Sequence, residues 1–314
     1  MPQPLDVVVV GCVGVDTNVY LPGRDIDFDV EANFTENLDC LGHAGGYASR
    51  GYAALGLRTG FIGHVGDDFP GRLVRETFAR DGIDVRALFT DAGGTSRSVN
   101  IMHADGRRKN FYDGKRHPDP DPATCRAVMA GARLAHFNIP DWARRLLPMA
   151  RAEGLTLACD LQDVVDMDDP YRRDFIEASD ILFLSGANFP DPAPFLARLA
   201  AARPGRVAVC GMGARGCAVA TGAGVRAYPP VETGEPVVDT NGAGDALAVG
   251  FLSAHVLMGL SVEESVLRAQ IGARRACSLR STSEGLVTRD EVERTVRDLK
   301  AACVPAGGPS QRRR

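Results

Sequence analysis

The chain has 314 residues, of which 45% are hydrophobic and 24% charged, and its formal net charge at pH 7 is −4. These values are typical of a globular protein with one large α/β domain or two ordinary ones. The acidic balance argues against a nucleic-acid binder, which usually carries a basic stripe, and no apolar run approaches the roughly 20 residues that span a membrane.

The chain runs into an apolar strand, Val7–Val10, without the basic start and apolar core of a signal peptide, so we expect a cytoplasmic protein. Short apolar runs then alternate with amphipathic helical stretches, which predicts a mainly parallel sheet with helices on both faces. Ligands of such sheets bind beyond the carboxyl ends of the strands. The later predicted strands are Thr59–Ile62, Leu134–Phe137, Thr156–Cys159, Ile181–Leu184 and Val207–Val209, and the predicted helices are Gly45–Leu55, Gly71–Asp81, Trp142–Glu153, Phe195–Ala202 and Ala246–Leu260.

Two segments interrupt this alternation, at residues 16–41 and 95–113. The second contains two strand-like runs, Ser98–Met102 and Lys109–Tyr112, with turn signals at Asp105-Gly106 and Asp113-Gly114. We therefore expect a small inserted antiparallel sheet, a lid on a core of residues 1–15, 42–94 and 114–304. An exposed strand face on this lid would invite pairing and a homodimer, and residues 305–314 have the composition of a disordered tail.

Eight cysteines are scattered along the chain without a Cys-x-x-Cys pair, several of them in apolar strands. This pattern favours buried reduced thiols over a zinc site or a disulfide framework. The cysteines are at positions 12, 40, 125, 159, 210, 217, 277 and 303.

Polar residues follow several of the predicted strands. Asp16 comes after the first strand, where a carboxylate can grip two hydroxyls or simply cap a turn. Asn138 follows Leu134–Phe137, and Asp160 follows Thr156–Cys159. Asp163 is close to Asp160 in the sequence and is either part of the same group or a surface residue. Side chains at these strand ends converge on one edge of the sheet, which predicts a binding site there.

The segment Gly211-Met212-Gly213-Ala214-Arg215-Gly216 has the spacing of a dinucleotide-binding loop. A helix should follow such a loop, but the next residues, Cys217–Ala220, have the character of a strand. The glycines therefore predict a hairpin-like turn, and a dehydrogenase becomes a distant alternative.

The most informative segment is the strand end and turn Val237–Gly244, which leads into a long apolar helix. Small residues let a ligand approach the backbone, and the free amides at a helix start attract an anion, most often a phosphate. Asp245 in the first turn either caps the helix or takes a proton from a nucleophile beside that phosphate. Phosphoryl transfer to a hydroxyl, with Asp245 as the base, accounts for the whole segment.

The string Asp239-Thr240-Asn241-Gly242-Ala243-Gly244-Asp245 resembles the signature of the ribokinase-like (phosphofructokinase-B type) kinases, and Gly42–Gly56 resembles their N-terminal signature. The resemblance runs from Asp6 to about Val296. It implies a three-layer α/β/α sandwich with a small β lid, MgATP as phosphate donor, and a sugar, sugar phosphate or nucleoside as acceptor. The implied catalytic groups are Asp245 as base and the amides of Gly242, Ala243 and Gly244 as anion hole. The implied nucleotide contacts are Asn188, Gly211, Gly213, Gly216, Asp239, Thr240 and Asn241, and the implied acceptor contacts are Asp16, Gly45, Gly46 and Asp245. Further candidate acceptor contacts are His43 and Tyr47 in the first signature, Asn138 at its strand end, and Arg97 and Asn100 on the inserted sheet.

The chain departs from the family pattern in two places. His43 stands where the family has the second glycine of a pair, and Tyr47 where it has an Asn that commonly binds sugar hydroxyls. His43 is then a loop residue, an acceptor contact or a filler of space, and Tyr47 is a contact or a packed side chain. In the motif Asn-x-x-Glu, Ser185 and Asn188 replace the two named residues, so we expect Mg²⁺ to arrive with the nucleotide and Asp160 to assist only indirectly.

Ser281–Gly285 is either a simple loop or the flank of a site for a monovalent cation such as K⁺, as in relatives. We thus expect an ATP-dependent kinase, and the altered motifs leave a second hypothesis open. It is a weak or inactive protein that binds a sugar or nucleotide on a kinase fold.

Overall fold

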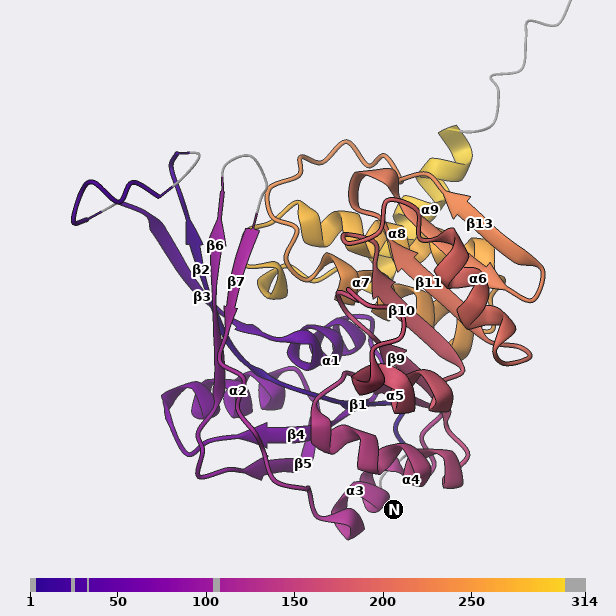
Figure 1. The fold of residues 1–314 in the computed structure, drawn as a ribbon, viewed down its shortest axis with the longest axis horizontal. Coiled ribbons are helices and arrows are strands. Elements are labelled where there is room, and N and C mark those ends of the chain that lie inside the picture. The colour runs from indigo at the N-terminus through magenta and orange to yellow at the C-terminus, as the bar shows by residue number, and fades with distance from the viewer. Residues whose placement is uncertain (1–3, 24–25, 33, 104–107, 303–314) are drawn as a thin grey trace, which may run out of the picture.

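A computed structural model describes residues 4–23, 26–32, 34–103 and 108–302. Its main feature is a nine-stranded sheet in the order β13-β12-β11-β10-β9-β8-β1-β4-β5 (Figure 1). The strands from β11 to β5 are parallel, and β12 and β13 are antiparallel at one edge. Their bounds are β1 Val7–Val10, β4 Thr59–Val65, β5 Asp84–Thr90, β8 Leu134–Phe137, β9 Thr156–Asp160, β10 Ile181–Ser185, β11 Val207–Gly211, β12 Cys217–Thr221 and β13 Gly224–Tyr228.

Helices cover both faces of this sheet, because successive strand residues point to opposite sides. Val7 and Val9 of β1 belong to one buried cluster, and Val8 and Val10 to another. The first cluster is shared with α1 (Ala44–Ala54), α2 (Phe69–Arg80), α7 (Ala243–Leu252), α8 (Val262–Cys277) and α9 (Arg289–Ala302), and the second with α3 (Pro122–Met129), α4 (Leu147–Ala152), α5 (Arg173–Ala178) and α6 (Ala193–Ala201).

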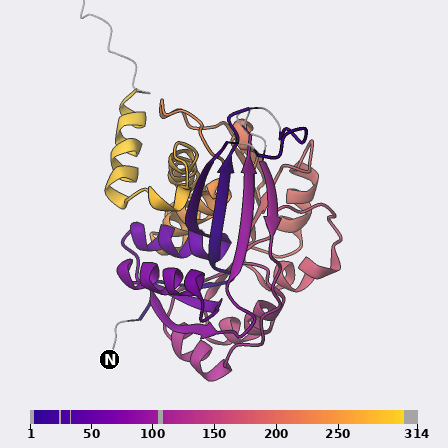
Figure 2. The same ribbon diagram turned by 90° about the vertical axis from the view of Figure 1, so that its left-hand side faces the viewer.

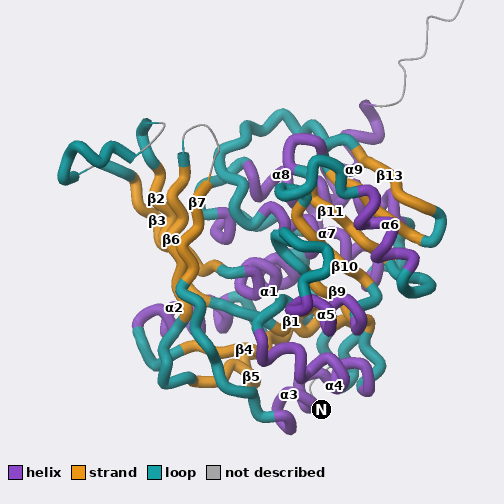
Figure 3. The backbone as a smooth tube through the Cα atoms, viewed as in Figure 1, coloured by secondary structure: helices purple, strands orange, loops and turns teal. Residues whose placement is uncertain are grey.

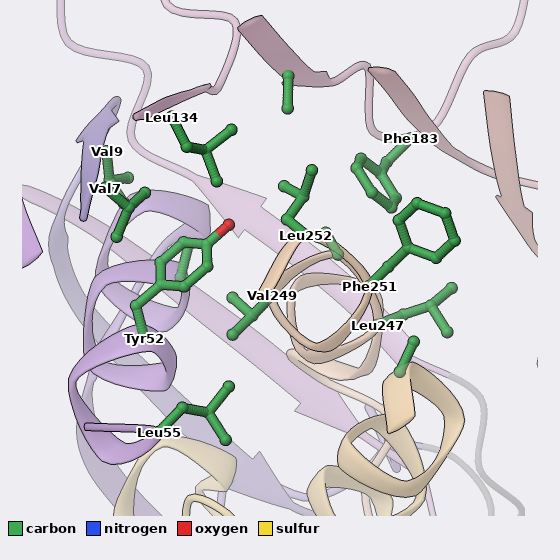
Figure 4. Close-up of a cluster of buried hydrophobic side chains, with 14 of the residues drawn as sticks. Val7, Val9, Tyr52, Leu55, Leu134, Phe183, Leu247, Val249, Phe251 and Leu252 are labelled. Atoms are coloured by element: carbon green, nitrogen blue, oxygen red, sulfur yellow. The ribbon is translucent and has the colours of Figure 1, made fainter. Parts of the chain in front are cut away.

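The close-up of the first cluster shows Tyr52 of α1 and Val249 of α7 side by side beneath the sheet (Figure 4). Gly51 lets the two helices approach, since a Cβ there would lie 3.2 Å from Val249. The predicted layered α/β fold with a mainly parallel sheet is confirmed, and the packing fixes α1 and α7, whose N-termini border the site described below.

Four strands form the second sheet, in the order β3-β2-β6-β7, which stands beside the core (Figures 1 and 2). The strands are β2 Gly14–Tyr20, β3 Glu36–Gly42, β6 Ser96–Met102 and β7 Arg108–Tyr112. The expected antiparallel sheet is wrong in one respect, because β2 and β6 pair in parallel. These two strands come from separate excursions of the chain, so no hairpin dictates their direction. The exact lid boundaries and a lid-mediated dimer stay predictions.

The helix boundaries differ from the predictions where a local backbone feature intervenes. α7 begins at Ala243, three residues earlier than predicted, because Gly242 adopts a left-handed conformation and starts the helix. It ends at Leu252 and continues as the π-helical segment η4, Ser253–Leu257. The predicted helix Trp142–Glu153 is divided into the 3₁₀ segment η1, Asp141–Leu146, and α4, with Pro148 in the first turn of α4. Three further short 3₁₀ segments are η2 Pro170–Arg172, η3 Gly213–Arg215 and η5 Thr282–Glu284, and Figure 3 shows how loops join the elements.

The seven described cysteines are free thiols, as predicted. In the part of the chain that the structure describes, no helix is both long and apolar enough to cross a bilayer. The turn predicted at Asp105-Gly106 and the tail predicted at 305–314 lie outside the described residues.

Candidate active site

A cleft of about 2330 Å³ lies between the lid sheet and the carboxyl ends of the core strands. The lid contributes residues of β2, β6 and β7, and the core contributes the loops after β8, β9, β10 and β11 together with the first turn of α7. A site at this edge of the sheet is where the strand-end polar residues were expected to meet.

The first turn of α7 forms the floor of the cleft. Gly242 has a φ of 74°, which a side chain would strain, and this conformation directs the chain into α7. The amides of Ala243, Gly244 and Asp245 fall at the helix start, where the helix supplies them no carbonyl acceptor. Gly242, Ala243, Gly244 and Asp245 all line the cleft, so an anion placed here would meet amide donors and a carboxylate together.

The electrostatic surroundings of Asp245 are unfavourable to a negative charge. The protein removes much of its hydration, which raises its pKa well above the usual value, and the Asp160 and Asp16 carboxylates add to the rise. The nearby Arg108 guanidinium acts in the opposite direction. Asp160, at the end of β9, is itself buried, and burial raises its pKa to about 6. Both carboxylates therefore hold protons more tightly than a free aspartate does.

Asp16 is fixed by the lid and by α1. Its carboxylate accepts hydrogen bonds from Ser98 Oγ at 2.5 Å and from Tyr47 Oη at 3.0 Å. Gly42 makes room for it, because a Cβ at that position would lie 2.1 Å from the carboxyl carbon. Asp16 and Tyr47 thus lie in one hydrogen-bonded group at the base of the lid, bordering the cleft.

Asn241, one residue before the left-handed Gly242, connects this group to the turn that precedes α7. Its amide nitrogen donates to Tyr47 Oη at 2.8 Å, and its amide oxygen accepts from the Arg108 guanidinium at 2.6 Å. Arg108 is the first residue of β7. A lid strand is therefore tied directly to the turn that carries Asp245.

His43 combines burial, an unusual backbone and an unused ring nitrogen. Its φ of 62° and ψ of 155° are conformations that essentially only glycine adopts without strain. The ring packs 5.1 Å from Tyr112, and Nε2 lies 3.5 Å from an Asp16 oxygen without a hydrogen-bond partner among the described residues. Burial lowers the pKa of His43, so its imidazole is neutral at pH 7.

Asn138 is the other polar residue at this end with unmet hydrogen-bonding capacity. It is 2% exposed, and in the described part of the protein neither its amide oxygen nor its amide nitrogen has a partner. The backbone at Gly11 and Gly45 approaches the side chain closely and confines it. A Cβ would lie 2.0 Å from the amide oxygen at Gly11 and 3.2 Å from it at Gly45. The side chain is held in place, lines the cleft, and has hydrogen bonds to offer a ligand.

The opposite end of the cleft is formed by the glycine loop after β11. β11 and β12 pair antiparallel across Gly211–Gly216, which confirms the hairpin-like turn. Asn188 also lines this end, and its amide donates to the Val164 carbonyl at 3.2 Å. Among the described residues, no group of three or more His, Cys, Asp or Glu side chains is arranged to hold a metal ion. Residues from the sequence prediction that line the cleft here are Gly211, Gly213, Gly216, Thr240 and Asn241.

Five predicted contacts lie behind or outside the cleft. Asp239 accepts from Tyr20 Oη at 2.6 Å and pins the turn. Asn100 is buried in an amide ladder with Asn18 and Asn110, and Arg97 points to the opposite face of β6 from Ser98. The remaining two, Gly45 and Gly46, instead allow α1 to pack closely, against the Cys12 carbonyl and Leu41 respectively.

The loop Ser281–Gly285 is held by the buried Arg50, whose guanidinium donates to the Ser283 carbonyl and to Glu284 Oε1. Sequence reasoning missed Arg108 as a site residue. Its predicted strand began at Lys109, and extending the period-two pattern by one residue would have placed Arg108 on the cleft face. Trp142 and His117 were missed for another reason, because no motif marks them and only the fold brings them to the cleft.

Comparison with known proteins agrees with this geometry. Residues 175–289 match the pfkB family of carbohydrate kinases. An acarbose 7(IV)-phosphotransferase from Actinoplanes sp. is 33% identical over 296 residues, which cover 92% of this chain and 97% of that protein. A fructokinase from Klebsiella pneumoniae is 28% identical over 291 residues, or 82% and 92% of the two chains.

Two solved structures are similar across nearly the whole chain. A microbiome-derived acarbose kinase superimposes with a TM-score of 0.83 at 31% identity, over 93% of this chain and 99% of that one. Arabidopsis thaliana ribokinase, complexed with ribose and ATP, gives a TM-score of 0.78 at 21% identity, over 93% and 98%. The second likeness concerns the fold alone.

Proposed function

This chain belongs to the pfkB family of carbohydrate kinases, and from that membership we propose that it transfers the γ-phosphoryl group of ATP to a sugar hydroxyl, with Asp245 as general base. The observation that carries the proposal is the first turn of α7. There a carboxylate of raised pKa and the amides of Ala243 and Gly244 border one cleft. A raised pKa makes Asp245 a stronger base than a free carboxylate.

In the proposed reaction, the acceptor hydroxyl lies between Asp16 and Asp245. Asp245 takes the hydroxyl proton as the oxygen bonds to the γ-phosphorus and the bond to the β-phosphate oxygen breaks, releasing ADP. The amides of Gly242, Ala243 and Gly244 stabilise the charge on the transferred group. Such transfers depend mainly on positioning and electrostatics.

Mg²⁺ would supply charge neutralisation at the phosphates. The buried Asp160, whose pKa of about 6 reflects the cost of an uncompensated charge, is the group best suited to a nearby cation. Asn188 would hold a water molecule there without adding charge. Because no cluster of ligands is arranged among the described residues, we propose that the ion arrives with the nucleotide.

The names of the relatives suggest the first acceptors to test. The 33% identical relative is called an acarbose phosphotransferase and another a fructokinase, so acarbose and fructose lead a panel of sugars, sugar phosphates and nucleosides in a coupled ADP-release assay. We expect ADP with at least one carbohydrate. Tight ligand binding with no ADP across the panel would instead favour a binding protein on a kinase fold.

Asp245→Asn tests the general base. We expect turnover to fall on the order of 10²–10⁴-fold with the same acceptor, since the proton then has no base. Asp163→Asn is a matched control, because it removes a carboxylate that borders the same cleft away from α7. Near-normal turnover by a folded Asp245→Asn variant would contradict the role.

A further inference from the structure

The cleft extends beyond the point of phosphoryl transfer. Its lining runs from Asp160, at the end of β9, to His117, whose ring stacks on His64 near the end of β4, three strands further along the sheet, a span of about 14 Å at the usual spacing. The total volume of about 2330 Å³ also exceeds the roughly 300–1,000 Å³ of ordinary small-molecule pockets.

Aromatic rings form a fixed wall at the far end. His117 stacks on His64, with centroids 5.1 Å apart and planes 4° from parallel, and Trp142 meets His64 edge-on at 5.0 Å. His117 Nδ1 lies 2.6 Å from an Asp91 oxygen, which fixes the imidazole. Both His117 and Trp142 line the cleft. The Trp142 indole has an apolar face and a polar edge, a combination that suits polyhydroxylated rings. The two nitrogens of His117 already face Asp91 and Ser96, so His117 would contribute its ring surface.

Unmet hydrogen-bonding groups continue along the same wall. In addition to the Asn138 amide, the indole N–H of Trp142 has no acceptor among the described residues, although Trp142 is only 3% exposed. Buried polar groups in proteins are normally hydrogen-bonded, so these two groups, which border one cleft, indicate a ligand that offers hydroxyls to both.

We propose that the acceptor site has an outer subsite, formed by Trp142 and His117, that binds the second ring of a di- or oligosaccharide whose first ring lies at Asp16 and Asn138. This inference rests on the proposed function, which sets the first ring beside Asp245. It makes Trp142 and His117 determinants of acceptor length and does not involve them in the chemical step.

The chain has a single tryptophan, so its fluorescence reports directly on this subsite. The protein, saturated with a non-hydrolysable ATP analogue, is titrated with glucose, maltose, maltotriose and acarbose. We expect tryptophan emission to change with the ligands of two or more rings and to stay constant with glucose. An equal response to glucose, or no response to any member of the series, would overturn the outer subsite.

Trp142→Phe keeps an aromatic side chain but replaces the indole with a smaller phenyl ring that has no N–H donor. By calorimetry we expect affinity for the longer ligands to fall about 3–10-fold, as for one lost hydrogen bond, with glucose binding unchanged. Tyr228→Phe, which removes a hydroxyl from β13 outside the cleft, is the control. Equal losses for all ligand lengths, or none, would contradict the proposal, and the wild-type fluorescence decides the matter if the variant fails to fold.

These readouts concern binding and are separate from ADP release. Length-dependent binding without ADP formation would support the outer subsite and contradict the kinase reaction. ADP formation together with tryptophan emission that does not depend on acceptor length would support the kinase reaction and contradict the outer subsite.

Discussion

At residue 43 the backbone is held in a conformation that costs a non-glycine residue about 1–3 kcal/mol. The family pattern that the sequence resembles has glycine there, whereas this chain has His43, with φ 62° and ψ 155°. Its ring lies between Asp16 and Tyr112 with Nε2 unused. Because packing alone would not require the strain, we propose that the His43 side chain contacts the acceptor beside Asp16.

Comparing His43→Gly with His43→Ala separates the effect of backbone strain from the effect of losing the imidazole ring. Both variants remove the imidazole, but only glycine relaxes the backbone. We expect His43→Gly to be the more stable of the two by about 1 kcal/mol, the reverse of the usual order for these residues, and both to raise the KM for the acceptor several-fold. Urea unfolding and steady-state kinetics measure the two effects. Alanine as stable as glycine would remove the strain argument, and an unchanged KM would remove the acceptor contact.

At the scale of elements, β7 and the turn before α7 are joined by one strong contact, from Arg108 to Asn241 at 2.6 Å. A charge-assisted hydrogen bond of this kind contributes more than a neutral one. Because Asn241 immediately precedes Gly242, this contact links lid strand β7 to the turn that we propose as the anion hole. Lid closure excludes water from phosphoryl transfer. We therefore expect this contact to favour transfer to the acceptor over hydrolysis of ATP.

Arg108→Met should therefore uncouple the enzyme. We expect turnover with the acceptor to fall about tenfold, the ratio of ADP formed without acceptor to ADP formed with it to rise, and the acid limb of the pH–rate profile to move to higher pH. The last effect follows because Arg108 lowers the pKa of Asp245. Lys109→Met is the matched control, since it removes a neighbouring charge on the other face of β7. If both variants behave alike, the contact has no specific role.

The elements also show what the sequence could predict. Strands such as Val7–Val10 and the turn before Asp245 are marked by local patterns, and the structure has them where expected. The parallel pairing of β2 with β6, and the contacts of His64 with both Trp142 and His117, join residues distant in the sequence. Local patterns carry no information on such pairings. The sequence shows that His43 departs from the family pattern, but the strain at this residue is evident only from its backbone dihedral angles.

For the whole molecule, stability in mild acid depends on two opposing pairs of buried groups. Burial lowers the pKa of His64 and His136 to about 4 from 6.5. Below pH 6.5 these histidines bind protons in the unfolded chain but not in the folded protein. Each histidine therefore lowers stability by about 1.4 kcal/mol for every unit that the pH falls, down to about pH 4. Asp160, with its pKa raised to about 6, acts oppositely, because the folded protein takes up its proton first. Asp245 acts in the same direction.

Two variants should separate these contributions. His64→Phe fills a site surrounded by aromatic rings and leaves no titrating group, so its unfolding free energy relative to wild type should rise by about 1.4 kcal/mol per unit as pH falls from 6.5 towards 4. Asp160→Asn should be more stable than wild type by about 3 kcal/mol above pH 7, because it lacks the buried charge, and should lose this advantage as pH falls from 6 to 3.8. Urea unfolding between pH 5 and 8 measures both slopes. Curves parallel to wild type would mean that neither group titrates in the folded protein as its burial requires. Opposite slopes would show that the buried Asp160 carboxylate costs stability at neutral pH and offsets the histidines in acid.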